Sequence, residues 1–217
     1  MNPAAAFPQR YTTVDVVIFA VTDGLLCILL SRHPLIPSAP SPTMFCLPGG
    51  YIDIGRDATF DDCALRTLRE KPGFAAPYPE PLSSRDSADR NPHGWMATHV
   101  YFALVPPPDA ACAQPLSLDH NDILCTALAR LHSKVEYTLR LAFLLAAPFT
   151  LPQLQRVYAP LLGRTLDKSA FRKRTRDASP LVEDGMTSGG FDRNAMNYHL
   201  AQRDSTINFS RPFRSEK

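Results

Sequence analysis

One stretch of the chain, Leu47 to Phe74 (LPGGYIDIGRDATFDDCALRTLREKPGF), constrains the fold more than any other. It opens with two adjacent glycines, which are typical of a tight loop, and Asp57 then supplies an acidic N-cap for a helix. The apolar residues that follow have the spacing of an amphipathic helix, namely Ala58, Phe60, Cys63, Ala64, Leu65 and Leu68. Because proline restricts the residue before it, Pro72 predicts that this helix ends by about Lys71.

This stretch resembles a Nudix box, whose family pattern is G-x5-E-x7-R-E-U-x-E-E-x-G-U, with U a bulky aliphatic residue. The matching residues are Gly50, Arg66, Leu68, Glu70, Gly73 and Phe74. Gly50 and Arg66 lie sixteen positions apart instead of the family's fourteen, so the loop or the first turn is longer. At the other three of the family's four glutamate positions the chain has different residues, namely Arg56 or Asp57, Thr67 and Lys71. The alternative is an ordinary amphipathic helix after a Gly-rich turn, but the whole run after the strand-like residues 45–47 favours the box.

The resemblance implies a site for a diphosphate, which Nudix enzymes cleave with divalent cations held by helix carboxylates. Such cations need oxygen ligands in nearly ideal positions, polarise phosphoryl oxygens and activate water. One carboxylate of that cluster is left, Glu70, and Lys71 puts a positive charge beside it. We therefore expect at most a weak metal site at Glu70, and no catalytic residue unless Glu70 is one. The ligand-binding residues that the resemblance implies are Gly49, Gly50, Arg66 and Glu70.

For Arg66 the sequence leaves two roles open. Its guanidinium group either contacts the ligand or only holds the helix in place by pairing with a nearby carboxylate. Nothing in the pattern of residues decides between these two roles.

The remainder of the first 147 residues predicts a sheet with helices on it. Val14 to Val21 and Leu25 to Leu30 are apolar runs around Thr22 to Gly24, and Asp-Gly between such runs predicts a β-hairpin. Their near-continuous apolarity predicts that both faces of the sheet are covered. Trp95 to Val105 predicts a further strand, and Asp119 to Leu131 predicts an amphipathic helix with its first residue as N-cap. The connecting segments are predicted as loops at residues 78–93 and 106–118, and as a helix-like connector at residues 134–147.

Composition limits the classes of protein to which the chain can belong. Its 217 residues, 45% hydrophobic and 20% charged, are enough for one large or two small globular domains. The five cysteines show no paired spacing, so we interpret them as reduced core residues. No signal sequence and no apolar run of membrane length is present, which predicts a cytoplasmic protein without a membrane partner.

Residues 150–177 have the pattern of a helix-turn-helix. Thr150 is a helix cap, Gly163 ends the first helix, and Asp167 caps a second helix over residues 168–177. Basic side chains on such a second helix neutralise DNA phosphates, and residues near its start reach base edges in the major groove. The DNA-binding residues predicted on this basis are Lys168, Ser169, Arg172, Lys173 and Arg176.

The charge balance and the residues that follow agree with this interpretation. Residues 1–149 hold 11 Lys or Arg against 14 Asp or Glu, whereas residues 150–217 hold 12 against 7. This asymmetry predicts contact with a polyanion, although a solvated basic face is the alternative. Leu181-Val182 and Tyr198 to Leu200, around the Gly-rich turn at residues 187–190, predict the two strands of a wing. A last strand is predicted at residues 205–213.

The order of segments along almost the whole chain resembles the NrtR-type regulators, which join a Nudix-like sensor to a winged helix. The segments are TVDVVIF, LPGG, CALRTLREKPGF, HGWMATHVYFAL, LDHNDIL, KVEYT, FTLPQLQRVYAPLLGRTLDKSAFRKR and FSRPF. The resemblance implies an α/β (α+β) fold: a Nudix-type α/β/α sandwich with a mixed sheet at residues 1–147, and a C-terminal winged helix-turn-helix domain at residues 148–217. It further implies a homodimer that binds operator DNA and senses ADP-ribose, another NAD-related metabolite or a sugar derivative, with no required cofactor.

Two other functions stay open at this point. One is a working Nudix hydrolase of the ADP-ribose pyrophosphatase type, which would need Mg²⁺ and in which the winged helix would serve dimerisation. The other is an inactive Nudix fold used as an interaction module. The degenerate box favours a sensor over an enzyme.

Overall fold

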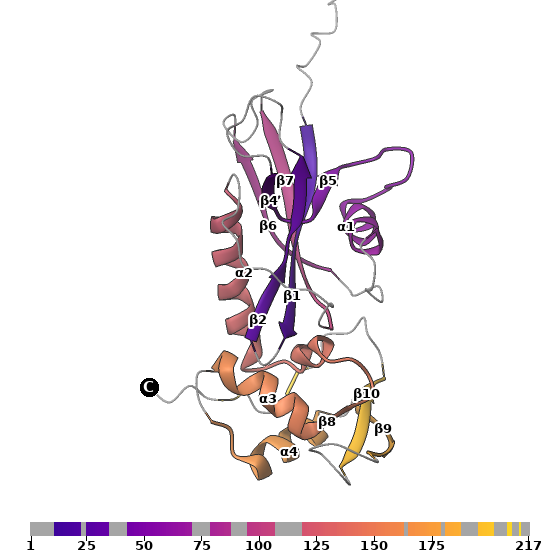
Figure 1. The fold of residues 1–217 in the computed structure, drawn as a ribbon, viewed down its shortest axis with the longest axis vertical. Coiled ribbons are helices and arrows are strands. Elements are labelled where there is room, and N and C mark those ends of the chain that lie inside the picture. Colours follow the sequence, from indigo (N-terminus) through magenta and orange to yellow (C-terminus); the bar gives the residue numbers. More distant parts are fainter. Residues whose placement is uncertain are drawn as a thin grey trace, which may run out of the picture.

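We describe the protein from a computed structural model, in which the described residues are 11–22, 25–34, 43–70, 79–87, 95–106, 119–162, 165–178, 181–187, 195–201, 208–209 and 213. A β-sheet between two helices lies at one end of the molecule, and a helical unit with a small sheet of its own lies at the other (Figure 1). Within the described residues no helix is long and apolar enough to cross a membrane.

The main sheet is mixed, as the sequence predicts. Its strand order is β2-β1-β7-β6, and β5 pairs with β1. The pairing of β1 with β7 is parallel, whereas β1 pairs antiparallel with β2 and with β5, and β6 pairs antiparallel with β7. The strands are β1 (Tyr11–Thr22), β2 (Leu25–Leu29), β5 (Gly49–Tyr51), β6 (Glu80–Ser87) and β7 (Met96–Leu104). A separate antiparallel pair is formed by β3 (Ser31–Pro34) and β4 (Thr43–Cys46).

Helices cover both faces of this sheet, because β1 alternates its apolar side chains between them. Val14, Val16 and Ile18 pack in one hydrophobic cluster with buried residues of α1 (Phe60–Arg69). Val17 and Phe19 pack in a second cluster with α2 (His120–Val135) on the other face. Figure 1 shows α1 and α2 on opposite sides of the sheet, so the predicted α/β/α layering is confirmed.

The C-terminal unit is a helix-turn-helix followed by a wing, as predicted. Its first helix begins with a reciprocal cap: the Gln153 N–H donates to Thr150 Oγ1 at 3.3 Å, and the Thr150 N–H donates to Gln153 Oε1 at 2.7 Å. Its sheet has the order β8-β10-β9 with antiparallel pairing. The elements are η1 (Arg140–Leu144), β8 (Phe149–Thr150), α3 (Leu151–Leu162), α4 (Lys168–Asp177), β9 (Leu181–Met186) and β10 (Met196–Leu200).

An aromatic cluster holds this unit together and joins it to the rest of the molecule. Tyr158 of α3 and Phe171 of α4 pack with Phe209 and Phe213, with ring centroids 5.0 to 5.9 Å apart. The hydrophobic cluster on the α2 face continues from the sheet into these helices. The domain boundary predicted between residues 147 and 148 stays a prediction.

Four local predictions need correction. The predicted loop at 78–93 contains β6, and the predicted connector helix at 134–147 is the end of α2, a turn and η1. Asp57 is not the N-cap of α1, since Thr59 is. Of the predicted last strand, the described residues form only an isolated bridge, between Asn208 and Thr138. The predicted turn at Asp23-Gly24, the loop at 107–118 and most of the Gly-rich turn lie outside the described residues.

Candidate functional site

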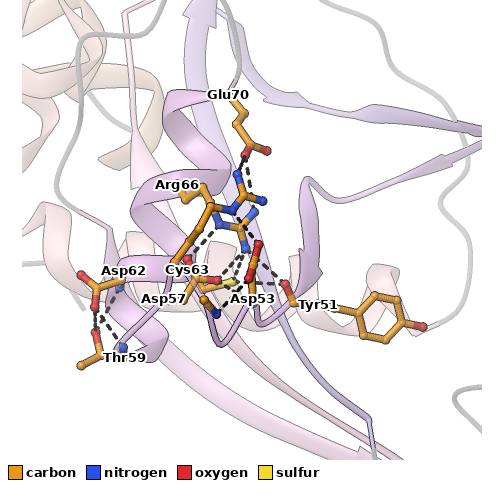
Figure 2. Close-up of polar contacts among 10 residues, drawn as sticks. Tyr51, Asp53, Asp57, Thr59, Asp62, Cys63, Arg66 and Glu70 are labelled. Atoms are coloured by element: carbon orange, nitrogen blue, oxygen red, sulfur yellow. Dashed lines mark hydrogen bonds and ion pairs between the residues drawn. The ribbon is translucent and has the colours of Figure 1, made fainter.

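The Nudix-like stretch folds around one ion pair. Thr59 and Asp62 form a capping box at the start of α1, so Asp57 does not cap the helix. The Asp57 carboxylate, with 1% of its side chain exposed, accepts from Arg66 Nε at 2.8 Å and from Arg66 Nη2 at 2.7 Å (Figure 2). Two parallel bonds of this kind fix the orientation of a guanidinium group.

Arg66 also links α1 to the sheet. Its Nη2 donates to the Tyr51 carbonyl of β5 at 3.2 Å and to the sulfur of Cys63 at 3.3 Å. The hydrogen bonds from Arg66 hold the pKa of Asp57 well below its ordinary value, and the same bonds raise the pKa of Arg66. Burial raises the pKa of the Cys63 thiol to about 11, so the thiol stays protonated. The structural role predicted for Arg66 is thus present in the geometry.

Glu70 lies on the solvent side of the same cluster. Its Oε1 is 3.5 Å from Arg66 Nη1 and 3.7 Å from Arg56 Nη1, and 54% of its side chain is exposed. Arg56 in turn donates from Nε to Asp53 at 2.6 Å. Figure 2 shows the Glu70 carboxylate next to the guanidinium group of Arg66. The predicted ligand residues Arg66 and Glu70 are therefore in contact with each other.

A cleft of about 350 Å³ opens over this cluster. Its lining comes from the loop before α1 and from the outer face of that helix, namely Arg56, Asp57, Asp62, Leu65, Arg66, Arg69 and Glu70. Arg56 and Arg69 are lining residues that were not predicted from the sequence. Arg69 follows Arg66 by three positions and so lies on the same helix face, a signal the sequence already carries. Arg56 belongs to a loop, whose path has no such periodicity.

The two glycines predicted to bind ligand differ in their surroundings. A Cβ on Gly49 would lie 2.4 Å from Asp15 Oδ1 and 2.5 Å from the Val14 carbonyl, because β5 passes close to β1 there. A Cβ on Gly50 would meet nothing within 4 Å. Gly49 is therefore required by packing, whereas packing among the described residues does not require Gly50.

The donor set of the cleft does not fit the Mg²⁺ ion that a Nudix box implies. Thr67, which replaces the first helix glutamate of the family, is 5% exposed and belongs to the buried face of α1. Glu70 faces two guanidinium groups, which compete with a cation for its oxygens. In the part of the chain that the structure describes, no group of three or more His, Cys, Asp or Glu side chains is placed to hold a metal.

The second candidate site is the outer face of α4. Asp167 caps this helix by accepting from the Ala170 N–H at 2.7 Å, and Phe171 and Thr175 bury its inner face. The five predicted DNA-binding residues, Lys168, Ser169, Arg172, Lys173 and Arg176, are all exposed. Among the described residues, no carboxylate pairs with any of their four cations. Such a row of free cations on the second helix of a winged helix is suited to DNA phosphates.

Comparisons with known proteins agree with both parts of the structure. Residues 141–200 match the family model described as the NrtR DNA-binding winged helix domain. The ADPR responsive transcriptional repressor NtrR of Acinetobacter baylyi is 35% identical over 222 residues, which cover 94% of this chain and 88% of that protein. The crystal structure of Shewanella oneidensis NrtR complexed with a 27mer DNA is 31% identical, with a TM-score of 0.79 over 93% of this chain and 98% of that chain. The Nudix domain of Shewanella oneidensis NrtR, in a cocrystal structure with ADP ribose, is 30% identical, with a TM-score of 0.50 over 58% of this chain and 91% of that chain.

The fold and the two sites define a class of protein in which a Nudix-type domain is joined to a C-terminal winged helix. The similarity extends over nearly the whole length of the relatives. The chain belongs to the NrtR family. The resemblance and the fold class that the sequence predicts are thereby confirmed.

Proposed function

We propose that this protein is a transcriptional regulator that binds operator DNA through α4 and senses ADP-ribose, or a closely related nucleotide sugar, in its Nudix-type domain. The observation that carries the proposal is the exposed row of cations on α4, in a chain similar over its length to an ADPR responsive repressor. Such a regulator acts in the cytoplasm, where operator DNA lies.

On the DNA side, α4 serves as the recognition helix. Lys168, Arg172 and Arg176 recur every fourth residue and so form one row along it. Each cation that meets a phosphate releases a counterion, which contributes to affinity but not to sequence readout. Ser169, in the first turn, is in the place from which such helices contact base edges.

On the effector side, ADP-ribose occupies the cleft beside α1. Effector binding regulates DNA binding only if the two states of the protein, free and bound to DNA, differ in affinity for the effector. We propose that the protein is a homodimer, because two recognition helices then meet two half-sites about one helical turn apart, and an effector that alters their separation alters operator affinity. The hydrolase alternative finds no support in the donor set of the cleft, and a function as a mere interaction module leaves the cations of α4 unexplained.

The experiment that tests this proposal is a gel shift of the full chain against DNA upstream of its own and neighbouring genes, with and without ADP-ribose, at two salt concentrations. The expected result is a sequence-selective complex that weakens with salt and changes when ADP-ribose is added. Lys168→Ala and Arg172→Ala should weaken the complex, whereas Arg85→Ala, which removes one positive charge from β6, should not. Absence of any selective complex, with no effect of the α4 substitutions, would refute the regulator.

A further inference from the structure

The cleft beside α1 contains side chains that can bind an anion. In the Nudix family pattern, the corresponding stretch has carboxylates that bind cations. Three guanidinium groups line the cleft, those of Arg56, Arg66 and Arg69, and so do three carboxylates, of which Asp57 is paired with Arg66 and Asp62 with Thr59. Guanidinium groups only donate hydrogen bonds, and their planar donors match phosphate oxygens two at a time. A diphosphate therefore finds in this cleft the partners that a Mg²⁺ ion does not.

Arg66 uses some of its N–H donors to hold the fold and has another that faces the cleft. Nε and Nη2 bind the buried carboxylate of Asp57 at 2.8 and 2.7 Å, which fixes the plane of the guanidinium. Nη1 lies on the cleft side, 3.5 Å from Glu70 Oε1. The two roles that the sequence leaves open for Arg66 are thus compatible, because they use different nitrogen atoms of one group.

Glu70 occupies the place between two of these cations. A single oxygen, Oε1, faces Nη1 of both Arg66 and Arg56, at 3.5 and 3.7 Å. These distances exceed those of a good charge-assisted hydrogen bond, and the side chain is 54% exposed, so the contacts are easily replaced. Arg69 lines the same cleft, is exposed, and has no ion pair among the described residues.

We infer that the diphosphate of the effector binds directly to the guanidinium groups of Arg56, Arg66 and Arg69 without a divalent cation, and that it displaces Glu70, whose carboxylate contacts Arg66 and Arg56 in the free protein. This inference rests on the proposed function and specifies how its effector is held. It gives Glu70 the opposite role to a metal ligand, since Glu70 competes with the ligand for its cations.

The test is isothermal titration calorimetry, which measures the affinity of the full chain for ADP-ribose, once in EDTA and once in excess Mg²⁺. The gel shift is run alongside. The expected affinity is equal in the two buffers. Glu70→Gln removes the competing anion and should tighten binding by about twofold to fivefold, the strength of an exposed ion pair. Arg69→Met should weaken binding by roughly tenfold, as loss of one charged hydrogen-bonding partner does. Glu183→Gln, an identical change on the exposed strand β9, is the control and should leave binding unchanged.

The outcomes separate the inference from the proposed function. Equal affinity in both buffers, together with tighter binding of ADP-ribose to the Glu70→Gln variant, supports binding of the diphosphate without a metal ion. Binding that requires Mg²⁺, or that Glu70→Gln abolishes, overturns it while leaving the regulator intact if ADP-ribose still alters the gel shift. Failure of ADP-ribose to bind in either buffer overturns the inference and the choice of ADP-ribose as effector, whereas the gel shift alone decides whether the protein binds operator DNA.

Discussion

Glu80 is a nearly buried carboxylate whose replacement by the similarly shaped Gln should destabilise the fold. It begins β6, is 8% exposed, and is surrounded by three cations. Its carboxylate contacts Lys134 Nζ of α2, and its Oε2 lies 2.7 Å from Arg140 Nη1 of η1. Arg130 is the third cation, at 3.9 Å. One anion thus ties the sheet to the end of α2 and to the segment that leads into the winged helix.

Replacing Glu80 with Gln removes the charge and leaves its partners in place. Lys134 and Arg140 have only 17% and 11% of their side chains exposed, so each becomes a poorly solvated cation near another cation. Removing one partner of such a buried pair costs about 3 to 5 kcal/mol. Arg130, 40% exposed and at the limit of contact, adds at most about 1 kcal/mol. For a chain of this size the melting temperature should fall by roughly 6 to 20 °C.

Urea unfolding followed by circular dichroism measures this cost, with the exposed Glu183→Gln as the matched control. A double-mutant cycle with Arg140→Met identifies its source: the double variant should be less destabilised than the sum of the two single variants, because the two substitutions remove the same ion pair. A free-energy change for Glu80→Gln within about 1 kcal/mol of the control would refute the reasoning.

Three further outcomes are expected. Gly49→Ala should lower the free energy of unfolding by about 1 to 3 kcal/mol, because its Cβ meets the Val14 carbonyl at 2.5 Å, whereas Gly50→Ala should not lower it; equal urea midpoints would contradict this. The pKa of Asp57 is lowered, so its contribution to stability is present above the ordinary value of 3.8 and lost as pH falls further; Asp57→Asn should flatten the acid limb of the unfolding midpoint plotted against pH. Arg172→Ala should reduce the slope of log K against log salt by about 0.9 for one phosphate contact per complex and about 1.8 for two, and an unchanged slope would exclude Arg172 from the interface.

The elements that could be predicted are those whose residues follow a regular period. The run from Val14 to Val21 predicted a strand buried on both faces, and eight consecutive residues of β1 are buried. Thr150 and Asp167 predicted caps, and both accept the expected backbone hydrogen bonds. Asp119 lies at its predicted N-cap position, although its side chain makes no capping bond.

What could not be predicted depends on contacts between distant segments. β6 was predicted as a loop because it is polar and contains Pro81, which has no N–H for a sheet. The strand accommodates that proline because its pairing with β7 shifts register between Pro81 and Ser83. Asp57 was predicted as a cap, but its carboxylate accepts a hydrogen bond from Arg66, nine residues later.

The candidate site was predicted in the same uneven way. Arg66 and Glu70, which line the cleft, could be named from the family pattern, whereas Gly50 is not among the lining residues. Arg69 could have been found from its spacing to Arg66 on the helix, whereas Arg56 could not, because it lies in a loop. Cys125, predicted as a core residue, is exposed, since its position faces outward on α2.

The aromatic cluster beneath α4 has a consequence for the order in which the protein matures. The recognition helix rests on Phe213, over whose ring the guanidinium of Arg174 lies at 4.7 Å. Phe213 is held in turn by its N–H bond to the Glu136 carbonyl at 2.7 Å. The residues against which α4 packs thus include Phe213, which follows the helix in the chain. Because Phe213 follows α4 in the chain, this helix reaches its final packing only once Phe213 has been synthesised.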